Sequence, residues 1–125
     1  LGDTIKEIAE TKIRSIQKEA LIASQSAPEV YEAAERIAKL KGARLITPEG
    51  VLGKEVRQTI LETAVLKEWP LYLGENAVTA FAAAKHLTHR DYDPKMLLSV
   101  RLKGRFERIR PNVILDVGHN PLGAK

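Results

Sequence analysis

Cysteine is absent from this sequence, and aromatic side chains are few, with one Trp, two Phe and three Tyr among 125 residues. The lack of cysteine excludes disulfides, thiolate metal sites and cysteine nucleophiles, and it agrees with the reducing cytoplasm, where we expect the protein to act. No apolar run approaches the roughly 18 residues that a membrane-spanning helix needs. The charged N-terminal segment lacks the pattern of a signal peptide. We therefore expect no contact with a membrane.

Charge of neither sign dominates the chain. It has 20 Lys and Arg against 16 Asp and Glu, a formal net charge of +4, and 44% hydrophobic residues. This composition is typical of a globular domain, and the mild basicity is compatible with nucleotides, folates or nucleic acid as ligands. The only methionine is Met96, so no initiator methionine is present. We expect the chain to be a piece of a longer protein.

The first 47 residues have the pattern of a helix followed by a βαβ unit. Thr4 and Glu7 have the spacing of a capping box, which marks a helix start, and Gly42 marks a helix end. A strand, a helix and a strand with short connections predict parallel pairing and a right-handed crossover. The expected elements are a helix over residues 3–20, a strand over 20–24, a helix over 27–42 and a strand over 43–47.

The remaining residues predict further helices and two closing strands. Residues 51–67 favour a helix by apolar spacing, although their β-branched residues leave a strand open. Pro70 and Gly74 are expected to interrupt the helical pattern. The later elements are an alanine-rich helix over 75–87, a short helix after Pro94 and strands over 105–109 and 112–116, the last with a buried run at 113–115. The predicted fold class is α/β, with a partial parallel sheet flanked by helices.

Lys12 has an unusual position in the first helix. On a helical wheel it falls between Ile8 and Ile16, near the centre of the apolar face. One interpretation is that its side chain extends to the surface at the helix end. The other is that burial disfavours its charge, since desolvation lowers a lysine pKa by up to about 3–5 units. A neutral amine can act as a nucleophile, or take up carbon dioxide as a carbamate that ligates a metal.

Asn76 and Arg105 each have a structural and a functional interpretation. Asn76 suits the N-cap of a helix, and its amide, a donor and an acceptor together, also suits the edge of an adenine ring. Arg105 lies in the basic run 101–110, which contains Gly104 and is expected to be a hinge between two units. Its guanidinium fits a phosphate, and the same run could equally contact nucleic acid.

Asp116 and His119 follow the last expected strand. Asn120 and Pro121 have a local explanation, as the N-cap and first turn of a following helix. Asp116 and His119 have none, and ligands of open α/β sheets bind beyond the carboxyl ends of strands. Both are therefore candidate ligand-binding residues. The sequence contains no GxxxxGK[ST] loop and no GxSxG motif.

Four segments are similar to the motifs of one enzyme family. "VILDVGHNP" resembles an "LDGAHNP" signature, and "KGRFERI" resembles a "PGRFE" segment at a domain junction. "GENAVTAFAAA" is similar to an "ENAxTAxAAL" helix, and "LGDTIKEIAETK" is similar to "LGDTLEEIAxEK", which follows a metal-binding histidine. Spread over the whole chain in the same order as in the family, the four segments resemble the motifs of folylpolyglutamate synthases and dihydrofolate synthases, members of the Mur ligase superfamily.

The resemblance implies a fragment of an ATP-dependent ligase. Enzymes of this family use ATP and magnesium to phosphorylate a carboxylate of a folate, and the amine of L-glutamate attacks the acyl phosphate to give an amide, ADP and phosphate. The implied architecture is a Mur-ligase-like central domain fragment plus the first strands of a Rossmann-like C-terminal domain. Residues 1–100 would be the C-terminal half of the ATP-binding domain, and residues 101–125 the start of the glutamate ligase domain.

The resemblance also implies a role for each candidate residue. Lys12 aligns with the lysine that is carbamylated in the family to bind the second magnesium. Asn76 would contact adenine. Arg105 and Asp116 would contact the nucleotide phosphates and ribose. His119 would lie near the transferring phosphate.

The chain departs from the family at three motifs and covers only part of it. The family's "EKAG" corresponds to "ETKIRS" here, so that Ile13 and Arg14 replace the two small residues after the lysine. "DGAHN" is "DVGHN", and Tyr72 and Leu73 replace an "HQ" pair. The phosphate-binding loop, the first magnesium ligands, the folate loop and most of the glutamate-binding domain have no counterpart in the sequence. We expect the isolated chain to be inactive, with uncovered sheet edges that offer a route to self-association.

Two alternative functions remain. A Mur-type amino-acid ligase of cell-wall synthesis shares the chemistry, but the residues after Asp116 disfavour it. A small basic module would bind nucleic acid through residues 101–110. That module has no use for Asp116, whose carboxylate would repel phosphates, so we expect no nucleic-acid partner.

Overall fold

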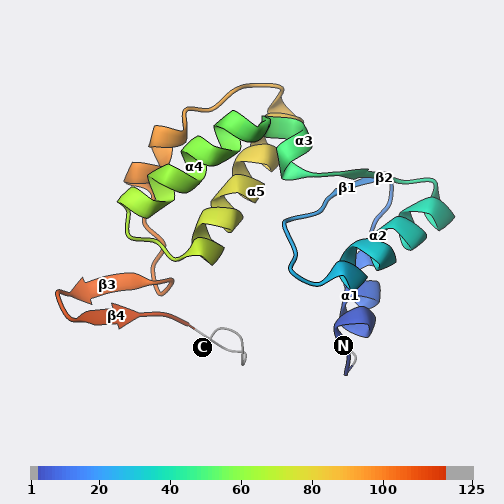
Figure 1. The fold of residues 1–125 in the computed structure, drawn as a ribbon, viewed down its shortest axis with the longest axis horizontal. Coiled ribbons are helices and arrows are strands. Elements are labelled where there is room, and N and C mark those ends of the chain that lie inside the picture. The colour runs from blue at the N-terminus through green and yellow to red at the C-terminus, as the bar shows by residue number, and fades with distance from the viewer. Residues whose placement is uncertain (1–2, 118–125) are drawn as a thin grey trace.

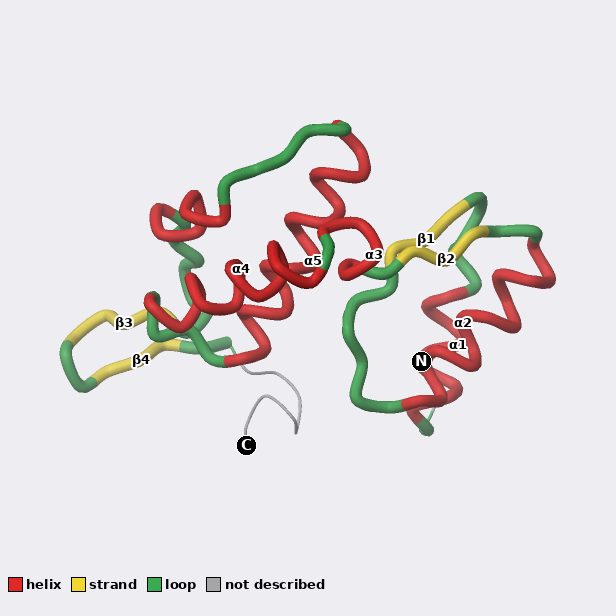
Figure 2. The backbone as a smooth tube through the Cα atoms, turned by 45° about the horizontal axis from the view of Figure 1, so that its top comes forward, coloured by secondary structure: helices red, strands yellow, loops and turns green. Residues whose placement is uncertain are grey.

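The computed structural model describes residues 3–117 and has a mixed α/β fold in which helices predominate (Figure 1). The two pairs of strands are short, as the view coloured by secondary structure shows (Figure 2). None of the helices within residues 3–117 combines the length and apolar character needed to cross a membrane. The elements are α1 (Ile5–Ile13), β1 (Glu19–Leu21), α2 (Pro28–Lys41), β2 (Arg44–Ile46), α3 (Pro48–Leu52), α4 (Lys54–Leu66), α5 (Leu71–Thr88), the 3₁₀-helix η1 (Pro94–Ser99), β3 (Glu107–Arg110) and β4 (Val113–Leu115).

Helix α1 begins with the expected capping box. The backbone N–H of Glu7 donates to Thr4 Oγ1 at 3.2 Å, and the N–H of Thr4 donates to Glu7 Oε2 at 3.1 Å. Backbone donors from Asp3 and Thr4 stabilise the carboxylate and hold the pKa of Glu7 below its ordinary value. The helix ends at Ile13, earlier than expected, yet Ile16 beyond its end is still buried.

The predicted βαβ unit is confirmed. Strands β1 and β2 pair in parallel, with Ala20 opposite Leu45, and α2 connects them. Helix α2 ends where Gly42 adopts a left-handed φ of 65°, a conformation that glycine adopts without steric cost. The first core cluster, which we call the βαβ core, consists of Ala9, Ile13, Ile16, Ala33, Ala34 and Ile37.

Residues 51–67 are helical, as their apolar spacing favours, but Gly53 divides the region between α3 and α4. Helices α4 and α5 pack against each other, and Ile60 and Val78 at their contact are both 0% exposed. A second core cluster, which we call the helical core, forms here with η1. Its buried members are Leu52, Ile60, Ala64, Ala77, Val78, Ala82 and Leu97.

The expected interruption by Pro70 and Gly74 is wrong for Gly74. Pro70 is the N-cap of α5, which starts at Leu71 and contains Gly74 in its interior. A Cβ at Gly74 would lie 3.2 Å from Leu61 Cδ2 and 3.4 Å from Ala64 Cβ. The glycine therefore serves close packing of α5 against α4, rather than ending a helix.

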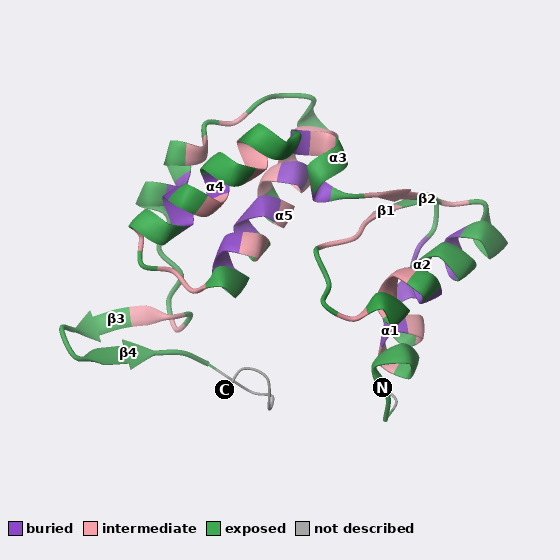
Figure 3. Cartoon of the chain, viewed as in Figure 1, coloured by how far each residue is buried: buried purple, intermediate pink, exposed green. Residues whose placement is uncertain are grey.

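The last two strands form an antiparallel hairpin, with an irregular register between Arg108 and Arg110. The prediction of a buried run at 113–115 is wrong, because Val113, Ile114 and Leu115 are 43%, 43% and 46% exposed. Figure 3 shows that β4 is exposed along its length, whereas the facing sides of α4 and α5 are buried. The strand forms locally, but no described element covers its apolar side chains.

Candidate functional site

The N-terminal end of α5 contacts the end of the hairpin. Tyr72, the second residue of α5, donates its hydroxyl hydrogen to Oδ2 of Asp116 at 2.6 Å. Asp116 follows β4 directly and is exposed. Residues 44 positions apart in the sequence thus meet at one point, and this contact joins the two parts of the candidate site.

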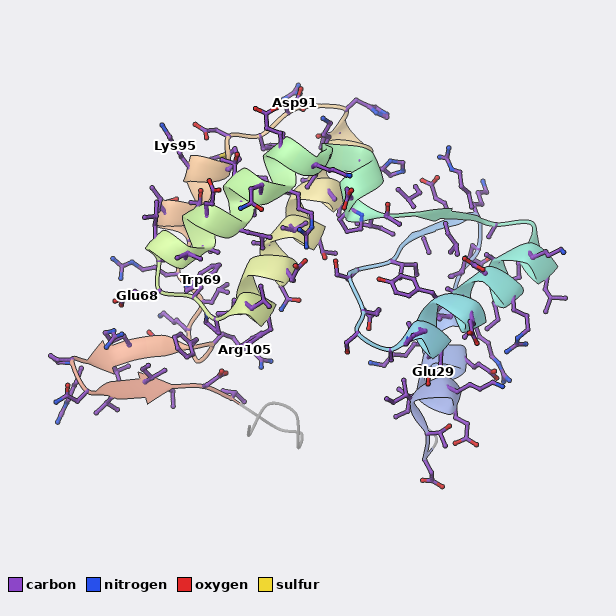
Figure 4. All side chains as sticks on the ribbon, viewed as in Figure 1. Glu29, Glu68, Trp69, Asp91, Lys95 and Arg105 are labelled. Atoms are coloured by element: carbon purple, nitrogen blue, oxygen red, sulfur yellow. The ribbon has the colours of Figure 1, made fainter. Side chains whose placement is uncertain are left out.

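Arg105 lies beside this contact. Its Nη1 donates to the carbonyl oxygen of Val117 at 3.0 Å, and the N–H of Val117 donates to the carbonyl of Gly104 at 2.9 Å. The residues before β3 and after β4 therefore lie side by side, with Arg105 and Asp116 on neighbouring segments. Figure 4 labels Arg105 between the hairpin and the lower end of α5.

The charges of Asp116 and Arg105 both act on the Tyr72 hydroxyl. Its hydrogen bond to the Asp116 carboxylate, reinforced by partial burial and by the negative charge, raises the pKa of Tyr72 above its ordinary value. The Arg105 cation acts in the opposite direction on the same pKa. A phenol, a carboxylate and a guanidinium are therefore close enough to influence one another.

Asn76 lies on the same face of α5 as Tyr72. The two residues are four positions apart, which places their side chains as neighbours on the helix surface, and Asn76 is exposed. The N-cap interpretation of Asn76 is wrong, because α5 begins at Leu71. Its amide is thus presented on the helix face that carries the contact with Asp116.

A cavity of about 320 Å³ adjoins Arg105, within the range typical of ligand pockets. The lysine Nζ of Lys67 lies 4.9 Å from the centroid of the Trp69 ring, and it also donates to the carbonyls of Leu98 and Val100 at 3.1 and 2.9 Å. The wall of the cavity is therefore partly aromatic and partly cationic. Among the residues that line it are Lys67, Glu68, Trp69, Arg101, Arg105 and Arg108.

Lys12 lies far from this region, since α1 and the hairpin are at opposite ends of the molecule (Figure 1). Of the two interpretations of Lys12, the structure agrees with the one in which its side chain reaches the surface, because Ala9 and Ile13 are buried and Lys12 is exposed. It lies in the last turn of α1, where a cation is favoured by the helix dipole. Its assignment as a carbamate stays a prediction, and His119 lies outside the described residues.

The described residues do not form a complete magnesium site. Within residues 3–117, no three or more His, Asp or Glu side chains gather as they would around a metal ion. A carbamate on Lys12 would supply one ligand of the several that magnesium requires.

A second cavity, of about 610 Å³, lies beyond the carboxyl ends of β1 and β2. None of the candidate residues of the sequence lines it. Arg57, on its wall, is paired with Glu75 of α5 at 2.5 Å, so its charge is already balanced. The polar residues on the wall are Ser24, Tyr31, Thr47, Glu49 and Arg57.

The structure thus brings Asn76, Arg105 and Asp116 to one region and adds Tyr72, which sequence reasoning missed as a site residue. One signal in the sequence could have pointed to it. Tyr72 occupies a position where the chain departs from the motif of the family that it resembles. A residue that differs from the family's motif and lies next to a matching helix motif is a candidate for a role of its own.

The fold is that of a folate-ligase-like α/β fragment. Among solved structures, the chain matches the folylpolyglutamate synthetase of Helicobacter pylori, with 33% sequence identity and a TM-score of 0.67. The match covers 99% of this chain and 32% of that chain, so this chain spans about a third of the length of its structural relative. This match confirms the resemblance that the four motifs indicate. No protein-family model matches the chain, and no match was found among curated proteins.

Proposed function

We propose that this chain is part of an ATP-dependent ligase that adds L-glutamate to a folate, and that α5 and the hairpin form its share of the nucleotide site. The observation that carries the proposal is the contact between Tyr72 and Asp116. It brings a carboxylate, a guanidinium and the face of α5 that bears Asn76 to one place. The likeness to a folylpolyglutamate synthetase supports the class of reaction.

The donor set fits the parts of a nucleotide. The amide of Asn76 can both donate to and accept from an adenine edge, and the guanidinium of Arg105 suits phosphate oxygens. The carboxylate of Asp116 would accept hydrogen bonds from ribose hydroxyls, because it would repel phosphates. ATP, when bound, supplies the phosphoryl group that activates the folate carboxylate. The roles of Lys12 and His119 rest on the resemblance alone.

Nucleotide binding can be tested on the 125-residue chain by titrating the ¹⁵N-labelled protein with ATP. We expect the largest shift changes in the first two turns of α5 and in residues 104–117, and weaker binding in Asn76→Ala and Arg105→Gln. Arg44→Gln is the matched control, since Arg44 is an exposed arginine paired with Glu19 in the βαβ unit. Shift changes confined to the βαβ unit, or none, would contradict the proposal.

Oligonucleotides in the same titration test the nucleic-acid alternative. That alternative requires salt-sensitive binding that is lost in Arg105→Ala and Arg108→Ala.

Folate extension by the purified chain is tested separately. We expect no ATP- and glutamate-dependent product from the purified chain, and detection of product would show that the chain is active by itself.

The class of substrate can be tested only when the rest of the ligase is present. A chimaera in which this chain replaces the matching segment of the Helicobacter pylori enzyme can be assayed with pteroates and with UDP-muramoyl substrates. We propose folate, L-glutamate and ATP as the substrates, so the pteroates should be extended. Extension of the UDP-muramoyl substrates instead would favour the cell-wall ligase.

A further inference from the structure

We propose that Tyr72 is a positioning residue of this nucleotide site, holding Asp116 against α5 so that one carboxylate oxygen is aimed at the ligand. The inference rests on the proposed function above. It concerns a side chain for which the motif resemblance provides no role, and it follows from the hydrogen bond between the Tyr72 hydroxyl and Asp116 Oδ2.

Tyr72 lies in a helical turn whose backbone is held by hydrogen bonds and burial. The N–H groups of Leu73 and Gly74 both donate to the carbonyl of Pro70, at 3.0 and 3.3 Å. Both residues are also buried, and Gly74 lies close to Leu61 and Ala64 of α4. The backbone of this first turn of α5 is therefore fixed around Tyr72, while the Tyr72 side chain is 47% exposed and extends to the hairpin.

The Asp116 carboxylate, by contrast, directly follows the β3–β4 hairpin, which has few contacts that hold it in place. The apolar residues of β4 are exposed, so burial contributes little to holding the hairpin in place. A second polar link, between Arg108 and Glu68 at 3.1 Å, joins side chains that are 48% and 74% exposed, and such pairs contribute little. The bond from Tyr72 is a hydrogen bond to a charged acceptor, which is the stronger kind.

The geometry assigns different tasks to the two carboxylate oxygens. Tyr72 donates to Oδ2 of Asp116, which leaves Oδ1 to accept a hydrogen bond from a ribose hydroxyl. A carboxylate fixed in this way does not have to lose rotational freedom when the ligand binds. Phenylalanine at position 72 would keep the ring and remove only the donor.

The test is a double-mutant cycle of Tyr72→Phe and Asp116→Asn in the 125-residue chain, with ATP affinity measured by shift titration. We expect Tyr72→Phe to weaken ATP binding up to about tenfold, the scale of one hydrogen bond to a charged group. It should have little further effect in the Asp116→Asn background, because coupled residues are not additive. Tyr92→Phe is the control: it removes a tyrosine hydroxyl bond to Thr88 at 3.1 Å, at the other end of α5.

A ligand series separates positioning from a general structural role. If Asp116 binds the ribose, the unmodified chain should bind ATP more tightly than 2′,3′-dideoxy-ATP, and Tyr72→Phe should lose most of this preference. General destabilisation would weaken both nucleotides equally. Equal weakening, or independent effects of the two substitutions, would overturn the inference.

Amide hydrogen exchange distinguishes failure of the inference from failure of the proposed function. Tyr72→Phe should speed exchange in residues 107–117 and leave α4 unchanged. If the unmodified chain binds no ATP, the proposed function is wrong, and the nucleotide role of Tyr72 falls with it even if exchange shows the contact. If ATP binds normally and exchange is unchanged in Tyr72→Phe, the inference alone is wrong.

Discussion

The helical core and the β3–β4 hairpin contain similar apolar residues in opposite surroundings. Ile60 in α4 is 0% exposed, whereas Ile114 in β4 is 43% exposed. The first lies between packed helices, and the second lies on a strand that no described element covers. The difference shows that the helical part is held by burial and the hairpin mainly by polar contacts.

This contrast has a consequence for the candidate site. Its helical half, with Asn76, stands on a packed element, while Asp116 and Arg105 stand on the hairpin. Polar contacts at a surface are weaker than burial of apolar groups. The two halves of the site are therefore set relative to each other by a small number of side chains, of which Tyr72 is the clearest.

The largest difference between the helical core and the hairpin is expected when the same substitution, isoleucine to alanine, is made in each of them. Ile60→Ala should lower the free energy of unfolding by about 2–5 kcal/mol, because it leaves a cavity in a closed core. Ile114→Ala should change it by no more than about 0.5 kcal/mol, as is usual for exposed sites. Urea denaturation followed by circular dichroism measures both, and equal losses would show that the hairpin is packed in solution.

A smaller effect is expected at alkaline pH. The folded-state pKa of Tyr72 is raised by its bond to Asp116, so the stabilisation is fully present below the ordinary tyrosine pKa of about 10 and is lost as pH rises through the raised value. The loss should not exceed about 1 kcal/mol, since the pair is accessible to solvent. Amide hydrogen exchange in residues 107–117 should therefore become faster above about pH 10, before exchange in α4 and α5 changes. Tyr72→Phe should remove this pH dependence.

The smallest effect is expected at acid pH, in the βαβ unit. Bonds from Arg44 and then His86, each at 2.7 Å, lower the pKa of Glu19. Its contribution is present above the ordinary carboxylate pKa and is lost as pH falls through the lowered value. The NMR chemical shifts of β1 should therefore change below about pH 4 in the unmodified chain and should not change in Glu19→Gln. Glu29→Gln is the control and should behave like the unmodified chain. A hairpin that responds equally would contradict this localisation.

Local features of the fold could be predicted from the sequence because their causes are local. The capping box of Thr4 and Glu7 acts within one turn, and the end of α2 at Gly42 follows from a backbone conformation that glycine favours. The parallel pairing of β1 with β2 follows from the helix between them. The sequence predicts a helix break at Gly74, and this is wrong because the reason for a glycine at this position, close contact with Leu61, comes from another helix.

The site shows the same limit. Asn76, Arg105 and Asp116 could be selected from motif resemblance and residue chemistry, and the structure places them in one region. The sequence leaves open whether Lys12 is exposed or buried, because the helical wheel assumes that α1 continues beyond Ile13. The exposure of Val113 does not follow from the sequence, because an apolar run predicts a strand and not the presence of a covering layer.

The sequence by itself determined most of the order of elements and the class of fold, since spacing and caps act over short distances, and residue chemistry with motif resemblance proposed three side chains of the candidate site. Only the tertiary structure decided that Tyr72 meets Asp116, that the hairpin is uncovered and that Lys12 lies at the other end of the molecule. Contacts between residues far apart in the chain depend on how the packed elements are placed, and no local pattern specifies that placement.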